Sequence, residues 1–318
     1  MANIVLSGKC NLRCPYCFAE DFTTSQSKDM ELDDVIKAID FIADSGSVGL
    51  IGGEPLLYKN IDTVLSILNR DYRFRSVMVF TNGVFIKEHI DFLFSPKVSV
   101  LINLNSSKNT GKTSFDRSVE GIKMLLDRGM GRRVTLGINI YEENQDISEF
   151  TDTLRAFSFD RARISVTIPQ DKSEGAIKYF ERMKPTLLKV YRELKSIGVA
   201  PCYDCNTIPH CVFTEEEREF IRTMPYDSPM ERELLLGNNA VCSPIIDIYP
   251  DGTATRCFGC YDDLKVDIKD FKSLSDLSNF FFKEIDARRV HTLSRPECKD
   301  CYDYKTFKCY GGCLCYKR

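Results

Sequence analysis

The chain has 318 residues, a formal net charge of −3 at pH 7, and a composition that is 43% hydrophobic and 28% charged. This length suggests about two domains, and the composition is typical of a globular protein rather than a disordered one. The balanced charge does not provide the basic face that nucleic-acid binding needs, and no apolar run approaches the roughly 18 residues of a membrane span. Because no signal peptide is recognisable at the N-terminus, we expect a cytoplasmic protein.

Short strands alternate with helices over the first 200 residues. Strands rich in Val and Ile are predicted at 3–6, 48–51, 76–80, 98–104, 133–141 and 163–168. Apolar residues repeat at helical spacing over three segments between them, 32–42, 61–68 and 115–126. A longer helical pattern covers 174–196, and Pro185 is expected to kink or interrupt it.

Six strand–helix units in series predict a parallel sheet with right-handed crossovers, either doubly wound or an incomplete barrel. In both architectures, ligands bind at the carboxyl ends of the strands. After residue 200 this alternation ends, and one hairpin is predicted, from 245–249 through the turn Pro250-Asp251-Gly252 to 253–256. We therefore expect a first domain over 1–200 and a second over 201–318.

The 14 cysteines are unevenly distributed along the chain. Three lie at Cys10, Cys14 and Cys17, and the next one, Cys202, is the first of 11 that fall within the last 117 residues. In a chain without a secretion signal, clustered thiols favour metal binding over disulfide bonds. We expect the second domain to be built around metal.

The most informative motif is C-x3-C-x2-C over residues 10–17, directly after the first predicted strand. Three thiolates on one loop can hold three irons of a four-iron cluster and leave the fourth iron open to another ligand. A structural zinc site would require four protein ligands. With the aromatic Tyr16 before its last cysteine, the motif resembles that of the radical S-adenosylmethionine (SAM) superfamily.

Further motifs follow in the order that this resemblance implies. Gly52-Gly53-Glu54-Pro55 follows the second strand and is similar to the family's GGEP motif, whose glycine backbone and glutamate meet the methionine amino group of SAM. Thr81-Asn82-Gly83 follows the third strand, and Asn103-Leu104-Asn105 ends the fourth, where relatives contact the ribose. The resemblance implies a partial (β/α)6 TIM-like barrel, an iron–sulfur cluster on Cys10, Cys14 and Cys17, and SAM contacts from Tyr16, Gly52, Gly53, Glu54, Pro55, Thr81, Asn103 and Asn105.

The resemblance also implies a reaction. SAM chelates the open iron, one electron breaks the bond between its sulfonium and the 5′ carbon, and the resulting 5′-deoxyadenosyl radical takes a hydrogen atom from the substrate. The cofactor supplies the chemistry, while the protein positions it and excludes competing reactions. A reductant such as flavodoxin or ferredoxin would supply the electron.

The C-terminal cysteines are similar to the SPASM extension of some radical SAM enzymes, a small α+β domain that holds two auxiliary four-iron clusters. The first pattern is C-x9-G-x4-C from Cys242 to Cys257. The second, from Cys298 to Cys315, is two residues longer than the family pattern between its second and third cysteines, and its last cysteine comes early. Structural zinc at the C-x2-C pair is the alternative.

This second resemblance implies a ligand set for each auxiliary cluster and brings the total to three [4Fe-4S] clusters. The distal cluster would take Cys298, Cys301, Cys309 and Cys315. The proximal cluster would take Cys242, Cys257, Cys313 and a fourth ligand, for which we choose Cys211. Cys260, Cys205 or a position open to substrate are the alternatives for that fourth ligand.

Together these resemblances imply a radical SAM/SPASM oxidoreductase, a peptide maturase that crosslinks or dehydrogenates a peptide or protein side chain. The auxiliary clusters would accept an electron from the substrate radical. Because the chain begins at the first strand, we expect no precursor-peptide recognition domain before it. Formylglycine formation ranks lower, because Phe258 follows Cys257 where such relatives carry an acidic base.

Two alternatives remain for the function. One is a radical SAM dehydrogenase of a small molecule such as a sugar or an amino-alcohol. The other is a non-catalytic iron–sulfur or zinc-binding protein. The sequence identifies neither the substrate nor a general base.

Overall fold

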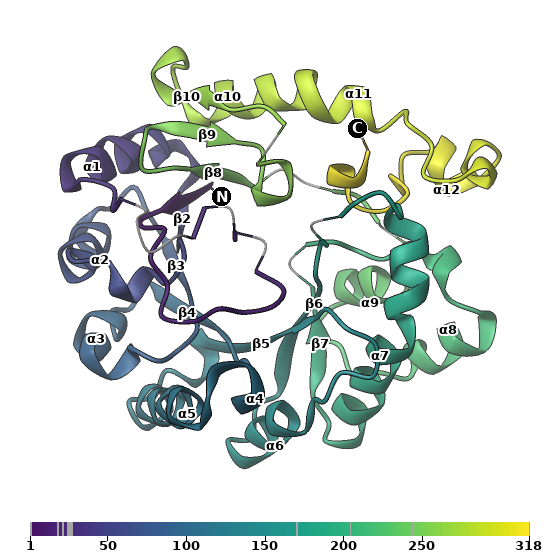
Figure 1. The fold of residues 1–318 in the computed structure, drawn as a ribbon, viewed down its shortest axis with the longest axis horizontal. Coiled ribbons are helices and arrows are strands. Elements are labelled where there is room, and N and C mark those ends of the chain that lie inside the picture. Colours follow the sequence, from purple (N-terminus) through teal and green to yellow (C-terminus); the bar gives the residue numbers. More distant parts are fainter. Residues whose placement is uncertain are drawn as a thin grey trace. The chain divides into compact units, whose positions relative to one another are not determined.

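The computed structural model describes residues 2–17, 19–20, 22–23, 28–169, 171–203, 205–238, 240–242, 245–261 and 263–317. The chain forms two compact units (Figure 1). The first unit comprises Met1–Thr135 and Pro244–Phe282, and the second comprises Leu136–Ser243 and Lys283–Arg318. This is a different division from the predicted domain boundary after residue 200, which stays a prediction.

Parallel strands form the centre of the first unit. They are β1 (Ala2–Val5), β2 (Ser47–Ile51), β3 (Ser76–Thr81) and β4 (Val98–Asn103). Neighbouring strands pair in chain order, with Ala2 opposite Val48, Ser47 opposite Ser76 and Val77 opposite Val98. Alternation is weak in these strands because most of their Val, Ile and Leu side chains are buried. The four predicted strands are confirmed to within one residue at each end.

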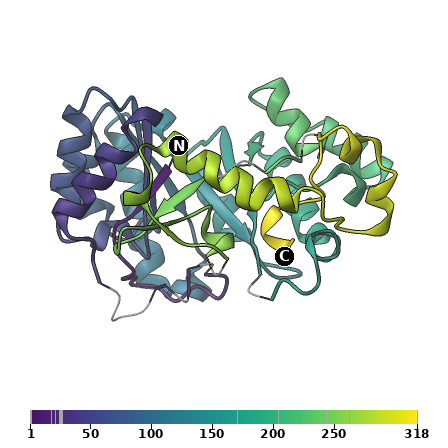
Figure 2. The same cartoon turned by 90° about the horizontal axis from the view of Figure 1, so that it is seen from above.

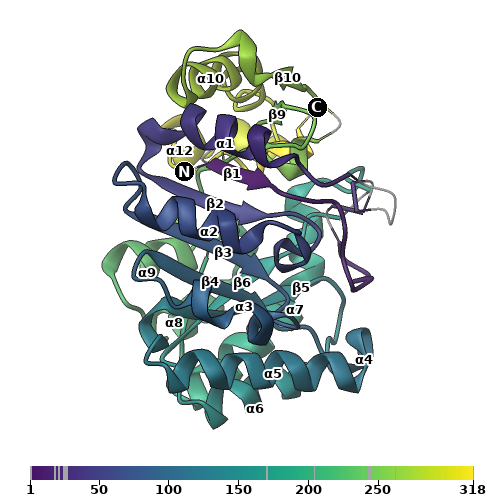
Figure 3. The ribbon, with the colours of Figure 1, turned by 90° about the vertical axis from the view of Figure 1, so that its left-hand side faces the viewer.

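Helices connect these strands and supply the rest of the core. They are α1 (Leu32–Phe41), α2 (Ile61–Arg70), α3 (Ile86–Leu93), α4 (Ser107–Thr110), α5 (Lys112–Asp127) and α10 (Leu274–Phe281). Figure 3 shows α1, α2 and α3 one after another across one face of the sheet, and Figure 2 shows the same purple and blue helices from above. In α2, the predicted apolar stripe is buried: Ile61, Val64, Leu65 and Leu68.

A segment from the C-terminal part of the chain completes the sheet of the first unit. β8 (Ile246–Ile248) and β9 (Thr253–Thr255) form the predicted antiparallel hairpin, whose turn places Gly252 at φ +79°. β8 also pairs in parallel with β1, and β10 (Val266–Asp267) pairs with β9. The pairing of β8 with β1 was not predicted, because it joins residues about 240 positions apart.

The second unit repeats the strand–helix alternation. Its parallel strands are β5 (Val134–Ile140), which belongs to this unit from Leu136 onward, β6 (Arg161–Val166) and β7 (Ala200–Cys202). Its helices are α6 (Ser148–Ala156), α7 (Ala176–Ser196), α8 (Glu215–Arg222), α9 (Pro229–Leu235), α11 (Ala287–Arg289) and α12 (Tyr302–Lys305). The predicted strands at 133–141 and 163–168 are confirmed, as is the α/β fold class.

The expected interruption at Pro185 is absent, since α7 is one continuous helix. A proline removes one backbone hydrogen bond and crowds the preceding turn. Here both halves of the helix are anchored by buried side chains, among them Phe180 and Met183 before the proline and Leu187 and Tyr191 after it. Tertiary burial therefore outweighs the local cost. No helix in the described ranges is both long and apolar enough to cross a membrane.

One hydrogen bond tests how β8 is held against β1. Asn3 Nδ2 donates to Asp247 Oδ1 at 2.7 Å, and both side chains are buried. Replacing Asn3 with Ala leaves the Asp247 carboxyl without this donor, so the free energy of unfolding should fall by about 1–3 kcal/mol. Chemical unfolding of anaerobically purified protein, followed by circular dichroism, measures the change.

Asn279→Ala is the matched control, because Asn279 is exposed on α10. Alanine is a good helix former, so this variant should stay within about 0.5 kcal/mol of the original stability. An Asn3→Ala protein as stable as the control would contradict a role for this bond in anchoring β8.

Candidate functional site

The cysteine loop, residues Cys10–Cys17, begins just after the carboxyl end of β1. Cys10, Cys14 and Cys17 are each partly exposed, and Leu12 N donates to Cys10 Sγ at 3.4 Å. Burial, together with the negative charges of Cys10 and Cys17, raises the pKa of Cys14 to about 12. The three predicted cluster ligands therefore lie close enough to interact, and a metal that replaces their protons would relieve this mutual repulsion.

Gly52 and Gly53 bring a second segment against the chain that leads into the cysteine loop. Gly53 N donates to Ser7 O at 2.9 Å, and Glu54 N donates to Lys9 O at 2.8 Å. A Cβ atom on Gly52 would lie 2.4 Å from Ser7 O, and one on Gly53 would lie 2.3 Å from Lys9 O. Because no larger residue fits this approach, the two glycines fix Glu54 beside the first cysteine.

Glu54 is buried and held by three donors of the chain. Thr81 Oγ1 and Leu56 N donate to Oε1 at 2.7 and 3.0 Å, and Asn82 N donates to Oε2 at 2.8 Å. Burial raises the pKa of Glu54 to about 7, although these donors act in the opposite direction. Since each carboxylate oxygen can accept two hydrogen bonds, these donors leave one acceptor position on Oε2.

Thr81 and Asn82 connect Glu54 to the cysteine loop. Asn82 Nδ2 donates to Asn11 Oδ1 at 2.8 Å, within the loop itself. Asn82 Oδ1 in turn accepts from Val84 N at 3.0 Å, which fixes the amide. Thr81 was predicted to contact SAM, and here its hydroxyl is a donor to Glu54. Asn11 and Asn82 were not predicted as site residues, and only their position inside the two motifs could have pointed to them.

The other predicted SAM contacts lie on the same segments. Pro55 is buried and begins the short 3₁₀ helix η2 (Pro55–Leu57), and Tyr16 is half-buried with its hydroxyl near Cys14. Asn103 and Asn105 are half-buried at and just beyond the carboxyl end of β4. Contact of Asn103 and Asn105 with a ribose stays a prediction.

The first unit thus has the donor set that a four-iron cluster with bound SAM requires. Three cysteine sulfurs converge on one loop, so one iron of such a cluster would lack a protein ligand. Beside that loop, Glu54 offers one buried acceptor position. Within the described residues, no three His, Cys, Asp or Glu side chains are grouped in the way that a single metal ion requires.

Four cysteines gather in the second unit. Burial, together with the charges of Cys211, Cys298 and Cys301, raises the pKa of Cys309 to about 11. The pKa of Cys211 is likewise raised by reduced solvation and then by Cys298 and Cys301. Cys298 and Cys309 are buried, Cys301 is half-buried, and Cys211 is exposed. The structure therefore groups Cys211 with three predicted distal ligands, whereas the sequence assigned it to the proximal cluster.

The remaining predicted ligands are divided between the units. Cys313 and Cys315 are buried in the second unit with their sulfurs 3.1 Å apart, and Cys242 lies in the same unit. Cys257 lies in the first unit, where a hydrogen bond from Cys260 and the charge of buried Arg256 lower its pKa. The assembly of these residues into a proximal cluster stays a prediction.

Comparison with known proteins bears on the first part of the chain. The model of the Radical SAM superfamily matches residues 4–157, a range that contains the cysteine loop, Glu54 and Thr81. The GTP 3′,8-cyclase of Chlorobaculum tepidum is 28% identical over 209 residues, which cover 61% of this chain and 62% of that protein. The antilisterial bacteriocin subtilosin biosynthesis protein AlbA of Bacillus subtilis is 28% identical over 177 residues, or 50% of this chain and 38% of AlbA. The chain spans less than two thirds of either relative.

Solved structures resemble nearly the whole chain. Streptococcus suis SuiB bound to precursor peptide SuiA matches with a TM-score of 0.60 and 18% identity, covering 98% of this chain and 71% of SuiB. The structure of anSMEcpe with bound AdoMet (SAM) matches with a TM-score of 0.67 and 17% identity, covering 98% of this chain and 89% of anSMEcpe. At such identities the likeness concerns the fold alone, and it confirms the predicted α/β partial-barrel class with its Cys-rich C-terminal region. This chain therefore carries a radical SAM domain, matched over residues 4–157.

Proposed function

We propose that the chain is a radical SAM enzyme that oxidatively modifies a peptide or protein side chain, by forming a crosslink or by dehydrogenation. The observation that carries the proposal is the joining of three clustered cysteines to a buried glutamate through Gly52 and Gly53. When bound, a [4Fe-4S] cluster and SAM supply the one-electron cleavage of SAM and hence the radical that takes a hydrogen atom from the substrate.

The residues of the chain take distinct roles in this proposal. Cys10, Cys14 and Cys17 hold three irons as thiolates. Glu54 accepts a hydrogen bond from the amino group of SAM at the acceptor position on Oε2. Thr81 and Asn82 keep the carboxylate in place through the 2.7 and 2.8 Å bonds, and so act as positioning residues.

Three relatives support a peptide as the substrate. SuiB has been solved with its precursor peptide SuiA, anSMEcpe with a Kp18Cys peptide, and AlbA is named for the biosynthesis of a bacteriocin. An oxidised product requires that the substrate lose one electron, and a proton to solvent, besides its hydrogen atom. The gathered cysteines of the second unit support auxiliary clusters that accept this electron, which makes three clusters in all. Flavodoxin or ferredoxin is the proposed reductant of the cluster that cleaves SAM.

A small molecule is the second candidate substrate. It is favoured by the similarity of the chain to GTP 3′,8-cyclases. The alignment with the Chlorobaculum tepidum enzyme covers 61% of this chain. Incubation of the reduced enzyme with SAM and either cysteine-bearing peptides or GTP distinguishes the two. Under the leading proposal, mass spectrometry detects a peptide that has lost hydrogen, and GTP is recovered unchanged.

Cys14→Ala tests the enzyme class. Loss of one of three thiolates should prevent the SAM-cleaving cluster from assembling, and release of 5′-deoxyadenosine should fall to background. The measurement is chromatography of the products after anaerobic reconstitution, reduction and addition of SAM. Cys202→Ala is the control, because Cys202 lies in β7 with its sulfur 3.5 Å from Ala162 O, and it should retain full release. Release from the Cys14→Ala protein would refute the assignment.

Glu54→Gln tests the proposed contact with SAM. A hydrogen bond to a charged acceptor contributes about 1.5–3 kcal/mol, so SAM affinity should fall about ten- to hundredfold. The pKa of Glu54 is about 7 in the unliganded protein, and an N–H donor favours the ionised carboxylate. Binding therefore releases a proton, and affinity should rise as the pH increases through 7.

The Glu54→Gln protein should lose this pH dependence, as measured by equilibrium dialysis of SAM against reconstituted protein. Glu31→Gln is the control, since Glu31 is exposed in the first unit and should keep both the affinity and its pH profile. If the Glu54→Gln protein bound SAM with unchanged affinity, Glu54 would have no role in holding the amino group.

A further inference from the structure

We propose that one [4Fe-4S] cluster of the second unit is held by Cys211, Cys298, Cys301 and Cys309, so that Cys211 takes the place that the family pattern gives to Cys315. The inference rests on the proposed function in one respect, namely that auxiliary clusters are present. It concerns which side chains hold one of them, and it joins a turn near residue 210 to the C-terminal cysteines.

The turn that carries Cys211 is held in place from two sides. Cys211 lies in the short 3₁₀ helix η4 (His210–Val212). His210 N donates to Gly237 O at 3.1 Å, and Lys184 Nζ donates to Val212 O at 3.0 Å. A Cβ on Gly237 would lie 2.3 Å from His210 N, so glycine is required for this approach. Cys211 is thus on a fixed turn rather than a free loop.

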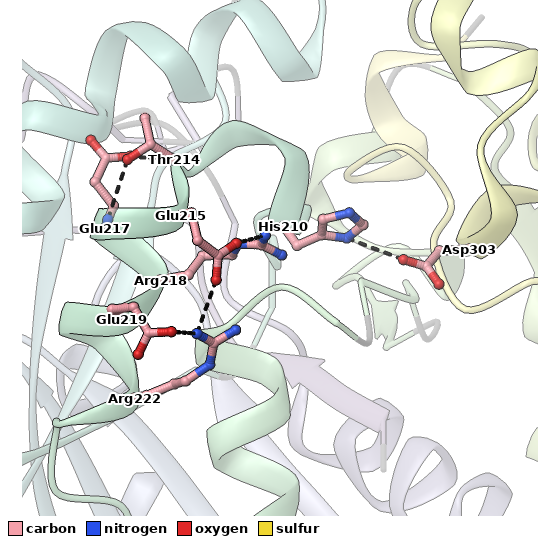
Figure 4. Close-up of polar contacts among 8 residues, drawn as sticks. All are labelled: His210, Thr214, Glu215, Glu217, Arg218, Glu219, Arg222 and Asp303. Carbon is pink, nitrogen blue, oxygen red and sulfur yellow. Dashed lines mark hydrogen bonds and ion pairs between the residues drawn. The ribbon is translucent and has the colours of Figure 1, made fainter.

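The segment between Cys301 and Cys309, which is two residues longer than the family pattern, contacts this turn. It contains the helical turn α12, in which Asp303 O accepts from Cys309 N at 3.1 Å. The Asp303 carboxylate faces the other way, with Oδ2 3.2 Å from His210 Nδ1, the residue next to Cys211 (Figure 4). Asp303 therefore links the backbone of Cys309 to His210, the residue that precedes Cys211.

Helix α8 (Glu215–Arg222) stiffens the same turn from its other end. Thr214 and Glu217 form a capping box at its start, and Glu215 pairs with Arg218 and Arg222 on its surface (Figure 4). Glu217 also pairs with Lys184, the residue that binds Val212 O. This network anchors Thr214, the N-cap residue of α8, which lies three residues after Cys211.

Cys315 has a different neighbour. Its sulfur lies 3.1 Å from that of Cys313, and both residues are buried. Cys309, in contrast, interacts with Cys211, Cys298 and Cys301, and Cys309 Sγ accepts from Gly311 N at 3.1 Å. The two groups of sulfurs are separated by the turn at Gly311 and Gly312, both with positive φ. Cys211 thus completes a set of four, and Cys315 pairs with the ligand that the sequence assigns to the proximal cluster.

A buried cation, the ammonium group of Lys317, lies near this group of four cysteines. Lys317 is 4% exposed, and its Nζ has no hydrogen-bond partner among the described residues. It lies within electrostatic range of Cys298 and Cys309, and Arg295 acts in the same way on Cys211. The ring of Tyr304 lies 5.1 Å from this ammonium, but a buried ammonium without a hydrogen-bond acceptor is costly. A four-iron cluster with four thiolates is net negative and would compensate it.

Paired substitutions test the ligand set by iron and sulfide analysis of the full chain after anaerobic reconstitution. With about four irons per cluster, Cys298→Ala and Cys211→Ala should each lose about four. If the two residues share a cluster, the variant carrying both changes loses no more than either alone. Cys211→Ala combined with Cys313→Ala should lose about eight. Cys202→Ala should lose none.

The opposite pattern would overturn the inference: a loss of about eight for Cys211 with Cys298, and of about four for Cys211 with Cys313. The auxiliary clusters of the proposed function would then stand. Full iron in the Cys298→Ala protein, or zinc in place of iron, would overturn the inference and the cluster count together. SAM cleavage, which depends on Cys14, reports separately on the enzyme class.

Lys317→Met tests the charge compensation. Reduction makes the cluster more negative, so a nearby buried cation favours the reduced form. Without Lys317, the reduction potential of this cluster should shift to more negative values, as measured by redox titration followed by electron paramagnetic resonance. Lys305→Met is the control, because Lys305 is exposed on α12 and paired with Asp300. An unchanged potential in the Lys317→Met protein would contradict the placement of the cluster beside Lys317.

Discussion

The site of the first unit depends on the close approach of two backbones. The backbone hydrogen bonds between β1 and β2 continue past the ends of both strands. Gly53 N donates to Ser7 O, and Glu54 N donates to Lys9 O. Only glycine permits this approach, since a Cβ at either position 52 or 53 would overlap a carbonyl oxygen. The extension carries Glu54 to the start of the cysteine loop. Thr81 and Asn82, at the end of the next strand, then fix its carboxylate.

Concentrated negative charge is the second constraint on the fold. Several thiols and one carboxyl are held where burial opposes their ionisation, as the raised pKa values of Cys14, Cys309 and Glu54 indicate. Such groups are stable when metal replaces their protons or when cations lie near them. Arg256 beside Cys257 and Lys317 beside Cys298 are buried cations of this kind. The chain thus keeps basic residues at its thiols although its net charge is slightly negative.

The two units use opposite routes to a cysteine cluster. In the first unit, the three cysteines of the N-terminal loop lie within eight consecutive residues, and the fold needs only to hold that loop. In the second unit, Cys211 is separated from Cys298 by more than eighty residues. Its approach depends on Gly237, Lys184 and the contact of His210 with Asp303. A local motif is therefore visible in the sequence, whereas a distributed one requires the tertiary structure.

The sequence alone determined the strand–helix alternation, the strand positions, the hairpin at Gly252 and the cysteine loop, because each depends on residues close together in the chain. Only the tertiary structure decided that β8 joins β1, that α7 continues through Pro185, and that Cys211 lies with Cys298, Cys301 and Cys309. These features depend on burial and on contacts between distant segments. The family's cysteine spacing could not predict the position of Cys211. The segment that contacts His210 lies between Cys301 and Cys309, where the chain departs from that spacing. The bonds from Thr81 and Asn82 to Glu54 were likewise not predicted, because they depend on how two separate motifs meet in the fold.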